Sequence, residues 1–391
     1  MLDLFQSDRE LAEKLSLGIL EDAKAENSTI GLVRSNYYLG YLQKRKGDLG
    51  KAIIYYLEGI RYGESAKYDG ANKDLVGLLK NTGTIFMKFQ NYDLAEKYFQ
   101  EASELASSSG LINEYVRLMY AHARLLKAKG QLSDAILILE STFDDFSAVS
   151  NKTIANIYSL LGSLYAESKD FQNADETFDK LILFVKDKEG LQSEFLTRAY
   201  HNLGMTAFTA GDYEVAAEHY KEALILKKKY ALEDESIFLT SKDLGESLMM
   251  SGDIRKAEKY LLDAEKLYSS ASSVSKHYEV FKLLSIINKK KGDLSNYSRY
   301  QDLYAQNLEA YVAERHEIEA SDKKYNLDLI TERYYAMVAE QERNKQITFY
   351  SKVGGASLVS LLFMVIGIFY YRKWKLKKDL EQAIKPLTNR I

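Results

Sequence analysis

Residues 200–223 read YHNLGMTAFTAGDYEVAAEHYKEA and contain two helix-forming runs separated by Gly211 and Asp212. Glycine commonly stands just past the end of a helix, and aspartate caps the beginning of the next one. Gly204 in the first run and Ala216 in the second are small enough to let two antiparallel helices approach closely. Tyr220, four residues after Ala216, supplies a ring that can fill the space beside them. The segment therefore predicts a helical hairpin.

The same pattern recurs along most of the chain at intervals of 39 to 43 residues. A single hairpin cannot bury its apolar face alone, so we expect the repeated hairpins to stack on one another. The small residues of the second helices are Ala12, Ala52, Ala95, Ala135, Ala174, Ala216 and Ala257. Those of the first helices are Gly40, Gly83, Ala123, Gly162, Gly204 and Gly245. The larger residues four positions after the second-helix alanines are Tyr56, Phe99, Leu139, Phe178, Tyr220 and Leu261.

This pattern resembles the tetratricopeptide repeat (TPR) family, and NYYLGYLQKRKGDLGKAIIYYLEG at residues 36–59 matches it as closely as residues 200–223 do. The resemblance covers roughly residues 9–305. It implies an all-α fold, a right-handed superhelix of TPR-like hairpins, with about seven hairpins over residues 26–305. The repeats are longer than the family's usual length of about 34 residues, so we expect each helix to be extended by about one turn.

The two ends of the array depart from the pattern. Within residues 1–25, Ala12 stands in register as part of a second helix, yet no first helix precedes it. We interpret residues 1–25 either as half a hairpin, in which case the native N-terminus lies upstream, or as a capping helix. The unit at residues 283–307 replaces the small residues by Ser285 and Tyr297, which is typical of a degenerate terminal repeat.

The C-terminal part of the chain predicts a long helix, one membrane span and a basic tail. Residues 306–352 contain no helix breaker and carry a loose apolar stripe, so we expect an amphipathic juxtamembrane helix, with pairing as a homodimeric coiled coil left open. Residues 353–371 contain 19 residues without a charge, and such a helix is about 28 Å long, close to the hydrocarbon thickness of a bilayer. A buried core helix is the alternative. Residues 372–391 carry seven bases and two acids.

The flanking charges predict the orientation of that span. Six bases lie within fifteen residues on its C-terminal side and three on its N-terminal side, which favours a cytoplasmic tail and a periplasmic repeat array in an inner membrane. The first residues, MLDLFQSDRE, have no apolar core and form no signal peptide. The alternative is therefore a tail-anchored cytoplasmic adaptor that docks a partner at the membrane.

The order of these segments resembles bacterial one-piece sensors, in which a TPR array, a charged helix and a span precede a histidine kinase or a LuxR-type DNA-binding domain. Residues 317–346 look like the charged helix of those proteins and residues 370–382 like their exit segment. No output domain follows, although the final PLTNRI resembles the first residues of a LuxR-type domain. The resemblance implies the sensing part of a protein that acts in signal transduction or regulates transcription.

Composition and motifs argue against an enzyme. The 391 residues include no Cys, which excludes disulfides, thiolate metal sites and cysteine nucleophiles, and a single Pro, which fits long helices. No phosphate-binding loop, dinucleotide fingerprint, zinc-protease motif or serine elbow occurs. The five His have no metal-ligand spacing. We expect no catalytic residue, no metal and no cofactor.

The TPR resemblance implies a binding groove lined by the first helix of each hairpin. In the first three full repeats its positions are basic and aromatic, which would suit an acidic or C-terminal-carboxylate peptide or protein segment. The alternative is an ordinary solvated helix face. Residues 1–352 sum to a charge of −8, so we expect no direct binding of nucleic acid. Later repeats place His201, Lys242 and Glu246 in the groove. The predicted groove residues of the first three repeats are Arg34, Tyr37, Tyr41, Lys44, Lys80, Arg117, Tyr120, Arg124 and Lys127.

Overall fold

The computed structural model describes the backbone of residues 9–142, 148–267, 277–325 and 327–388. Side chains are described for residues 10–316 within these ranges, and for residues 330, 332–340, 343–351, 363–376 and 378. The chain divides into two units, residues 1–327 and residues 328–391. The described residues of both units form helices, which confirms the predicted all-α class.

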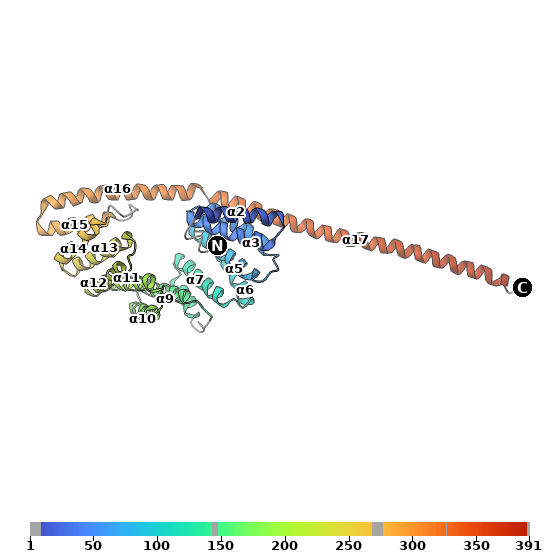
Figure 1. Ribbon diagram of the computed structural model, residues 1–391, viewed down its shortest axis with the longest axis horizontal. Coiled ribbons are helices and arrows are strands. Elements are labelled where there is room, and N and C mark those ends of the chain that lie inside the picture. Colours follow the sequence, from blue (N-terminus) through green and yellow to red (C-terminus); the bar gives the residue numbers. More distant parts are fainter. Residues whose placement is uncertain (1–8, 143–147, 268–276, 326, 389–391) are drawn as a thin grey trace. The chain divides into compact units, whose positions relative to one another are not determined.

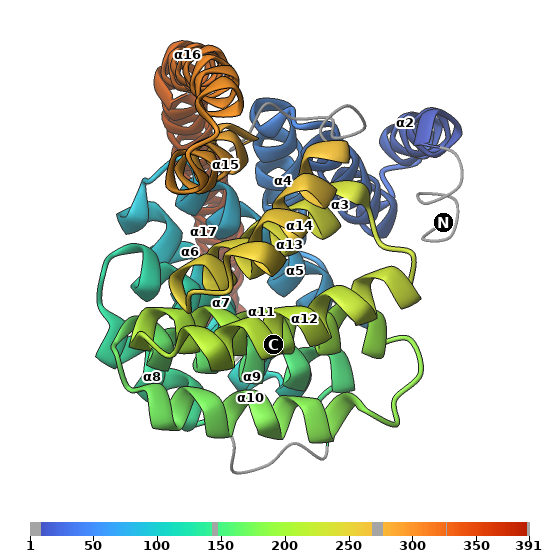
Figure 2. The same ribbon diagram turned by 90° about the vertical axis from the view of Figure 1, so that its left-hand side faces the viewer.

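The first unit is built from helix pairs that follow one another in chain order, each helix packing against the next (Figures 1 and 2). A single helix, α2 (Arg9–Ala25), precedes the pairs. The pairs are α3 (Thr29–Lys46) with α4 (Leu49–Gly63), α5 (Ala71–Lys88) with α6 (Tyr92–Ser108), α7 (Ile112–Ala128) with α8 (Leu132–Glu140), α9 (Asn151–Glu167) with α10 (Phe171–Val185), α11 (Gln192–Ala210) with α12 (Tyr213–Lys229), α13 (Asp234–Met250) with α14 (Ile254–Lys266), and α15 (His277–Lys291) with α16 (Leu294–Tyr325).

The turn inside a hairpin forms as its Gly-Asp sequence predicts. Gly47 ends α3 with a left-handed φ of 86°, a conformation that costs glycine little. The side chain of Asp48 then accepts a hydrogen bond from the backbone N–H of Lys51, which satisfies a free donor in the first turn of α4. Gly211 ends α11 in the same way, with a φ of 93°.

Small residues of the first helices pack against the rings of the second helices, as the repeat predicts. A Cβ built on Gly162 would lie 2.7 Å from Cε1 of Phe178, and one built on Gly204 would lie 2.7 Å from Cδ1 of Tyr220. Both distances are shorter than any contact that a real side chain tolerates, so only glycine fits beside these buried rings. The third pair uses a different combination, alanine against leucine. Ala123 and Leu139 are both fully buried.

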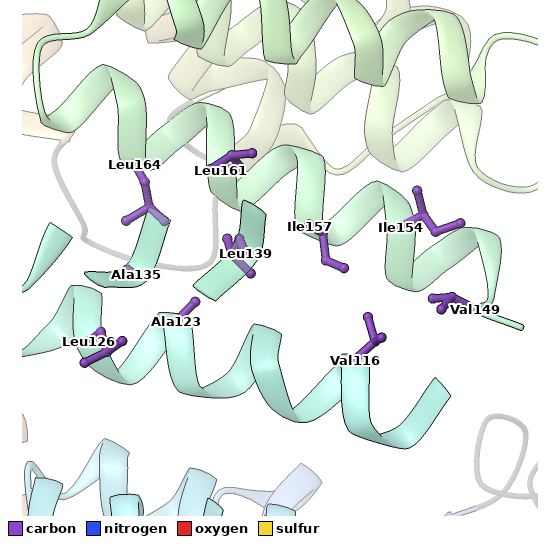
Figure 3. Packing of buried hydrophobic residues seen from close by; sticks show 10 residues of the cluster. All are labelled: Val116, Ala123, Leu126, Ala135, Leu139, Val149, Ile154, Ile157, Leu161 and Leu164. Carbon is purple, nitrogen blue, oxygen red and sulfur yellow. The ribbon is translucent and has the colours of Figure 1, made fainter. Parts of the chain in front are cut away.

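Apolar side chains fill the space between consecutive pairs. Figure 3 shows one such layer, in which Val116 and Leu126 from α7 and Leu139 from α8 face Ile157 and Leu164 from α9. First helices also contact the first helix of the next pair, at α3–α5, α5–α7, α7–α9, α9–α11 and α13–α15. The first helices α11 and α13 approach each other less closely. These contacts confirm TPR-like stacking, while the handedness of the superhelix remains a prediction.

Helix α2 packs against α3 in the place that a second helix would take. Ala12 is fully buried. Glu13 accepts a hydrogen bond of 2.6 Å from Nε2 of Gln43 and forms an ion pair with Lys46. Both readings of residues 1–25, half a hairpin and a capping helix, remain open, because residues 1–8 lie outside the described backbone.

The last helix of the array continues beyond the repeat length. Helix α16 continues unbroken through residues 305–306, where the sequence predicted a new segment. The second unit contains α17 (Leu327–Thr388). Among the residues that the structure describes, no helix meets the length and hydropathy expected of a membrane span. The predicted span at 353–371 falls partly outside them, because the side chains of residues 352–362 are not described.

Candidate functional site

Eight of the nine predicted groove residues line two adjoining pockets on the first helices α3, α5 and α7. We call the larger one, of about 350 Å³, the basic pocket, and its lining also includes Thr153 and Asn156 from α9. The smaller pocket contains Arg34, and the two share Tyr37, Lys80 and Arg117. The ninth residue, Lys127, lies at neither pocket, and its Nζ is 2.7 Å from a carboxylate oxygen of Glu167. The other predicted residues in the basic pocket are Tyr41, Lys44, Tyr120 and Arg124.

Helical spacing explains why these side chains meet. Tyr37, Tyr41 and Lys44 follow one another at intervals of four and three residues, so they share one face of α3. Leu39 and Leu42, on another face of α3, are buried in the core. Because the face with Leu39 and Leu42 packs into the core, the face with Tyr37, Tyr41 and Lys44 is left to line the pocket.

Four charged side chains of the smaller pocket form two ion pairs within it. Nε of Arg34 donates to Asp74 at 2.8 Å, and the hydroxyl of Tyr68 donates to the same carboxylate at 2.9 Å. Lys73 lies 3.6 Å from Glu114. These contacts pair four of its six charged side chains, while Lys80 and Arg117, which it shares with the basic pocket, stand outside them.

The four cations of the basic pocket, in contrast, have no carboxylate partner. These cations are Lys44, Lys80, Arg117 and Arg124. In the part of the chain whose side chains are described, none of them forms an ion pair within 4.0 Å. Nζ of Lys44 donates a long hydrogen bond of 3.5 Å to Oδ1 of Asn81. The guanidinium of Arg124 lies 5.9 Å from the ring centroid of Tyr120, within reach of a cation–π interaction.

Burial and the nearby positive charges both lower the pKa of the two lysines in the basic pocket. Burial, followed by the positive charges of Arg117 and Lys44, lowers the pKa of Lys80 to about 7, against a weaker opposing effect of Glu114. Burial and the charges of Lys88 and Arg124 lower the pKa of Lys44 as well. A bound anion would relieve this repulsion. The pocket can therefore bind negative charge and offers it several hydrogen-bond donors.

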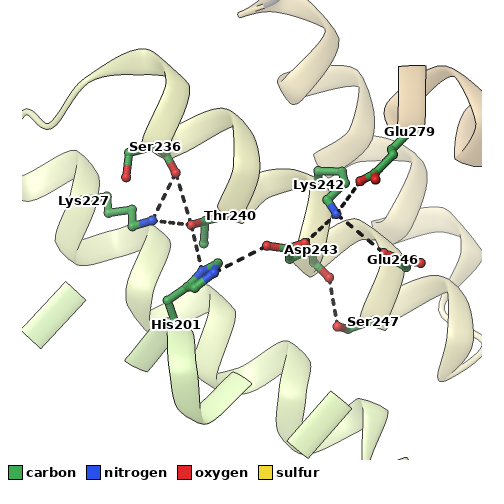
Figure 4. A network of polar contacts seen from close by, with 9 residues as sticks. All are labelled: His201, Lys227, Ser236, Thr240, Lys242, Asp243, Glu246, Ser247 and Glu279. Carbon is green, nitrogen blue, oxygen red and sulfur yellow. Dashed lines mark hydrogen bonds and ion pairs between the residues drawn. The ribbon is translucent and has the colours of Figure 1, made fainter. Parts of the chain in front are cut away.

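A second group of polar side chains joins α11, α12, α13 and α15 (Figure 4). Nζ of Lys242 lies 2.7 Å from Asp243 and 2.9 Å from Glu279. Nε2 of His201 lies 3.7 Å from the other oxygen of Asp243, and Nζ of Lys227 donates to the hydroxyl of Thr240 at 2.6 Å. We call these residues, with Glu246, the polar junction.

Burial controls the ionisation of the polar junction. It lowers the pKa of His201 to about 4, so the imidazole is neutral near pH 7. Burial also lowers the pKa of Lys227 to about 8. The sequence named His201 and Lys242 as groove positions but missed Lys227, Asp243 and Glu279. Lys227 lies on a second helix, outside the groove register. Only its place on the buried face of α12, three residues after Leu224, could have drawn attention to it.

No group of three or more His, Asp or Glu side chains arranged to hold a metal ion occurs within the described residues.

Comparison with known proteins agrees with the architecture. Residues 153–229 match the tetratricopeptide repeat family model. No protein of curated function matches the sequence. The structure resembles that of a signal-transduction ATPase with numerous domains (STAND) from Pyrococcus horikoshii that has a tetratricopeptide repeat sensor, with 14% identity and a TM-score of 0.61. That match covers 82% of this chain and 49% of the STAND protein.

Two further solved structures are similar. The apo form of RapI shares 12% identity at a TM-score of 0.60, over 79% of this chain and 87% of RapI. Aspartyl phosphate phosphatase F from Bacillus subtilis shares 14% identity at a TM-score of 0.52, over 74% of this chain and 73% of that protein. At such low identity these likenesses establish the fold alone. The chain thus has a TPR fold.

Proposed function

We propose that this chain is a TPR protein-interaction module whose basic pocket binds an acidic segment of a peptide or protein. The observation that carries the proposal is the group of four cations that share one pocket and have no carboxylate partner within it. Ion pairs within the chain neutralise most charged side chains of the described first helices. A group of cations that is not neutralised in this way is suited to bind an anion from a partner. The tyrosines of the same pocket provide rigid apolar surface beside the charges.

The module belongs, in this proposal, to the sensing part of a bacterial protein that acts in signal transduction or regulates transcription. The likeness to the STAND protein, whose TPR part is named a sensor, supports this assignment. The likeness to RapI supports it as well. The array would act by binding and not by catalysis.

The binding proposal can be tested with a fluorescein-labelled glutamate-rich peptide, added to the purified full-length chain and followed by fluorescence anisotropy. Binding should weaken tenfold or more in Arg117→Gln and in Lys44→Gln, since each substitution removes a charge from the pocket. Lys221→Gln is the matched control, because Lys221 is an exposed cation on α12. Equal affinity of all four proteins for the peptide would disprove the role of the basic pocket.

A second proposal is that α17 anchors the array in a membrane. Its support is the uncharged sequence of residues 353–371 together with large apolar side chains that are exposed in the described part of α17. Phe363 and Phe369 are 69% and 67% exposed, and Trp374 is 56% exposed. Exposed apolar rings in such number are suited to a lipid environment.

The orientation we favour places the repeats in the periplasm and the tail in the cytoplasm, and a cytoplasmic adaptor anchored by its tail is the alternative. Because the chain has no Cys, a single cysteine at Glu189→Cys or Asn389→Cys gives an unambiguous label. Intact cells would be treated with a membrane-impermeant maleimide. Labelling of Glu189→Cys alone supports the periplasmic array. Labelling of Asn389→Cys alone, or of neither before lysis, supports the adaptor. Recovery of the chain in the soluble fraction would refute the anchor.

A further inference from the structure

The basic pocket presents donors from three helices to one volume. Helix α3 contributes Lys44 and Tyr41, α5 contributes Lys80 and Thr84, and α7 contributes Arg117, Tyr120 and Arg124. A carboxylate accepts hydrogen bonds in one plane, whereas a phosphoryl group accepts them around three oxygens. Donors that converge from several directions fit the second geometry better than the first.

The number of charges leads to the same ligand chemistry. Among the residues whose side chains are described, the basic side chains of this pocket have no ion-pair partner, and their summed charge exceeds what one carboxylate can neutralise. A phosphoryl group carries about −1.5 to −2 charges at pH 7. Arg117 and Arg124 add planar guanidinium groups, which bind phosphoryl oxygens through two parallel hydrogen bonds. The pocket of about 350 Å³ is large enough for a side chain that bears such a group.

We propose that the basic pocket recognises a phosphorylated side chain of the partner peptide, and that Lys80 is the cation that determines this specificity. The proposal rests on the proposed function, since it names the ligand of the same site. Lys80 holds the central place because, with Tyr37 and Arg117, it belongs to both pockets.

The smaller pocket defines what flanks the phosphorylated residue. Beyond the shared Lys80 and Arg117, its charges are paired as Arg34–Asp74 and Lys73–Glu114, so that part would accept an uncharged neighbouring residue. Because the two pockets adjoin at Lys80, the peptide residue bound in the smaller pocket would be the one next to the phosphorylated residue in the basic pocket.

Binding should also be linked to protonation of Lys80. The charged groups that act on Lys80 are Lys44 from α3 and Arg117 and Glu114 from α7, and Tyr37 from α3 lines the same wall. Its pKa of about 7 leaves the amine mostly neutral at pH 8, and a bound dianion would raise that pKa. The complex should therefore take up close to one proton at pH 8.

The experiment uses the full-length chain and four labelled mixtures of eleven-residue peptides with random flanks. The central residue is phosphoserine, phosphotyrosine, glutamate or serine. We expect at least one phosphorylated mixture to be retained tenfold more than the glutamate mixture. Lys80→Gln should abolish this preference, while Lys221→Gln should keep it. For the best retained mixture, calorimetry at pH 8 in buffers of different ionisation enthalpy measures proton uptake, which should disappear in Lys80→Gln.

Each outcome decides the proposal. Equal retention of the glutamate and phosphorylated mixtures, lost in Arg117→Gln, would overturn the phosphoryl assignment and leave acidic-peptide binding intact. Retention of no mixture would overturn both. A phosphoryl preference that survives in Lys80→Gln would overturn the role of Lys80. Binding of inorganic phosphate as tight as that of the phosphorylated peptides would show an ion site without peptide recognition, and would also refute the proposal.

Discussion

Substitution of Gly162 by alanine tests the pairing between small residues and rings that organises the repeats. The added Cβ would lie 2.7, 2.8 and 2.9 Å from three atoms of the Phe178 ring, and that ring is fully buried. Overpacking of this kind costs about 1–3 kcal/mol. Alanine in place of glycine inside a helix stabilises the folded state by about 1 kcal/mol, because alanine has the higher helix propensity. With a rigid ring as the obstacle, we expect Gly162→Ala to lower the free energy of unfolding by about 1–2 kcal/mol.

The third hairpin indicates which second substitution should restore the stability that Gly162→Ala loses. There Ala123 packs with Leu139, and both are fully buried without a clash. Phe178→Leu alone should destabilise by about 1–2 kcal/mol through lost apolar contact. In the double variant, alanine and leucine reproduce the natural pair, so its destabilisation should be smaller than the sum of the two single effects by about 1–2 kcal/mol.

Urea unfolding of the four full-length proteins, followed by ellipticity at 222 nm, measures this double-mutant cycle. Gly245→Ala is the comparison, because its added Cβ would meet the branched side chain of Leu261, which can change rotamer. We expect Gly245→Ala to be the milder substitution. Additive effects of Gly162→Ala and Phe178→Leu, or a neutral Gly162→Ala, would refute the steric account of the repeat.

Three further predictions concern charge and backbone. The folded-state pKa of Lys80, about 7, lies below its ordinary value of 10.5, so the unfolded chain binds more protons between these two pH values. Stability should therefore rise with pH in that window, by at most about 1.4 kcal/mol per unit, and Lys80→Gln should remove this contribution in urea titrations at pH 7, 8 and 9.5. If the free energy of unfolding changed with pH equally in the wild type and in Lys80→Gln, this linkage to Lys80 would be contradicted. Lys242→Ala leaves Asp243, Glu246 and Glu279 clustered without their cation, so it should destabilise by about 3 kcal/mol at pH 8. Less should be lost at pH 5, because burial raises the pKa of Glu246 and its carboxylate takes up a proton more readily there, and an equal loss at both pH values would speak against the ion-pair account. Gly47→Ala should cost about 1 kcal/mol in thermal unfolding, since φ is 86° there although the space around it is open, and an unchanged transition would disprove the strain.

The sequence predicted the hairpins because their decisive contacts are local. Gly162 and Phe178 are sixteen residues apart, and the turn between them fixes their meeting. The same register placed Tyr37, Lys80 and Arg117 on one surface, since first helices stack on first helices. Sequence register could not show which cations are neutralised. Arg34 finds Asp74 forty residues away, and Lys127 finds Glu167, by side-chain geometry that spacing does not encode. Helix α16 continues past the repeat length because no glycine or proline ends it there, in keeping with the absence of a helix breaker from residues 306–352.

The polar junction has a mechanical consequence for the array. Apolar layers such as the one between α7, α8 and α9 can shift by small amounts with little loss of energy, because dispersion contacts have no preferred direction. At the polar junction, α13 meets its neighbours through directed bonds: Thr240 contacts His201 of α11 and Lys227 of α12, and Asp243 lies near His201. Such bonds lose strength when their angles change. The polar junction should therefore hold the rotation of α13 against α11 and α12 more firmly than apolar contacts alone would.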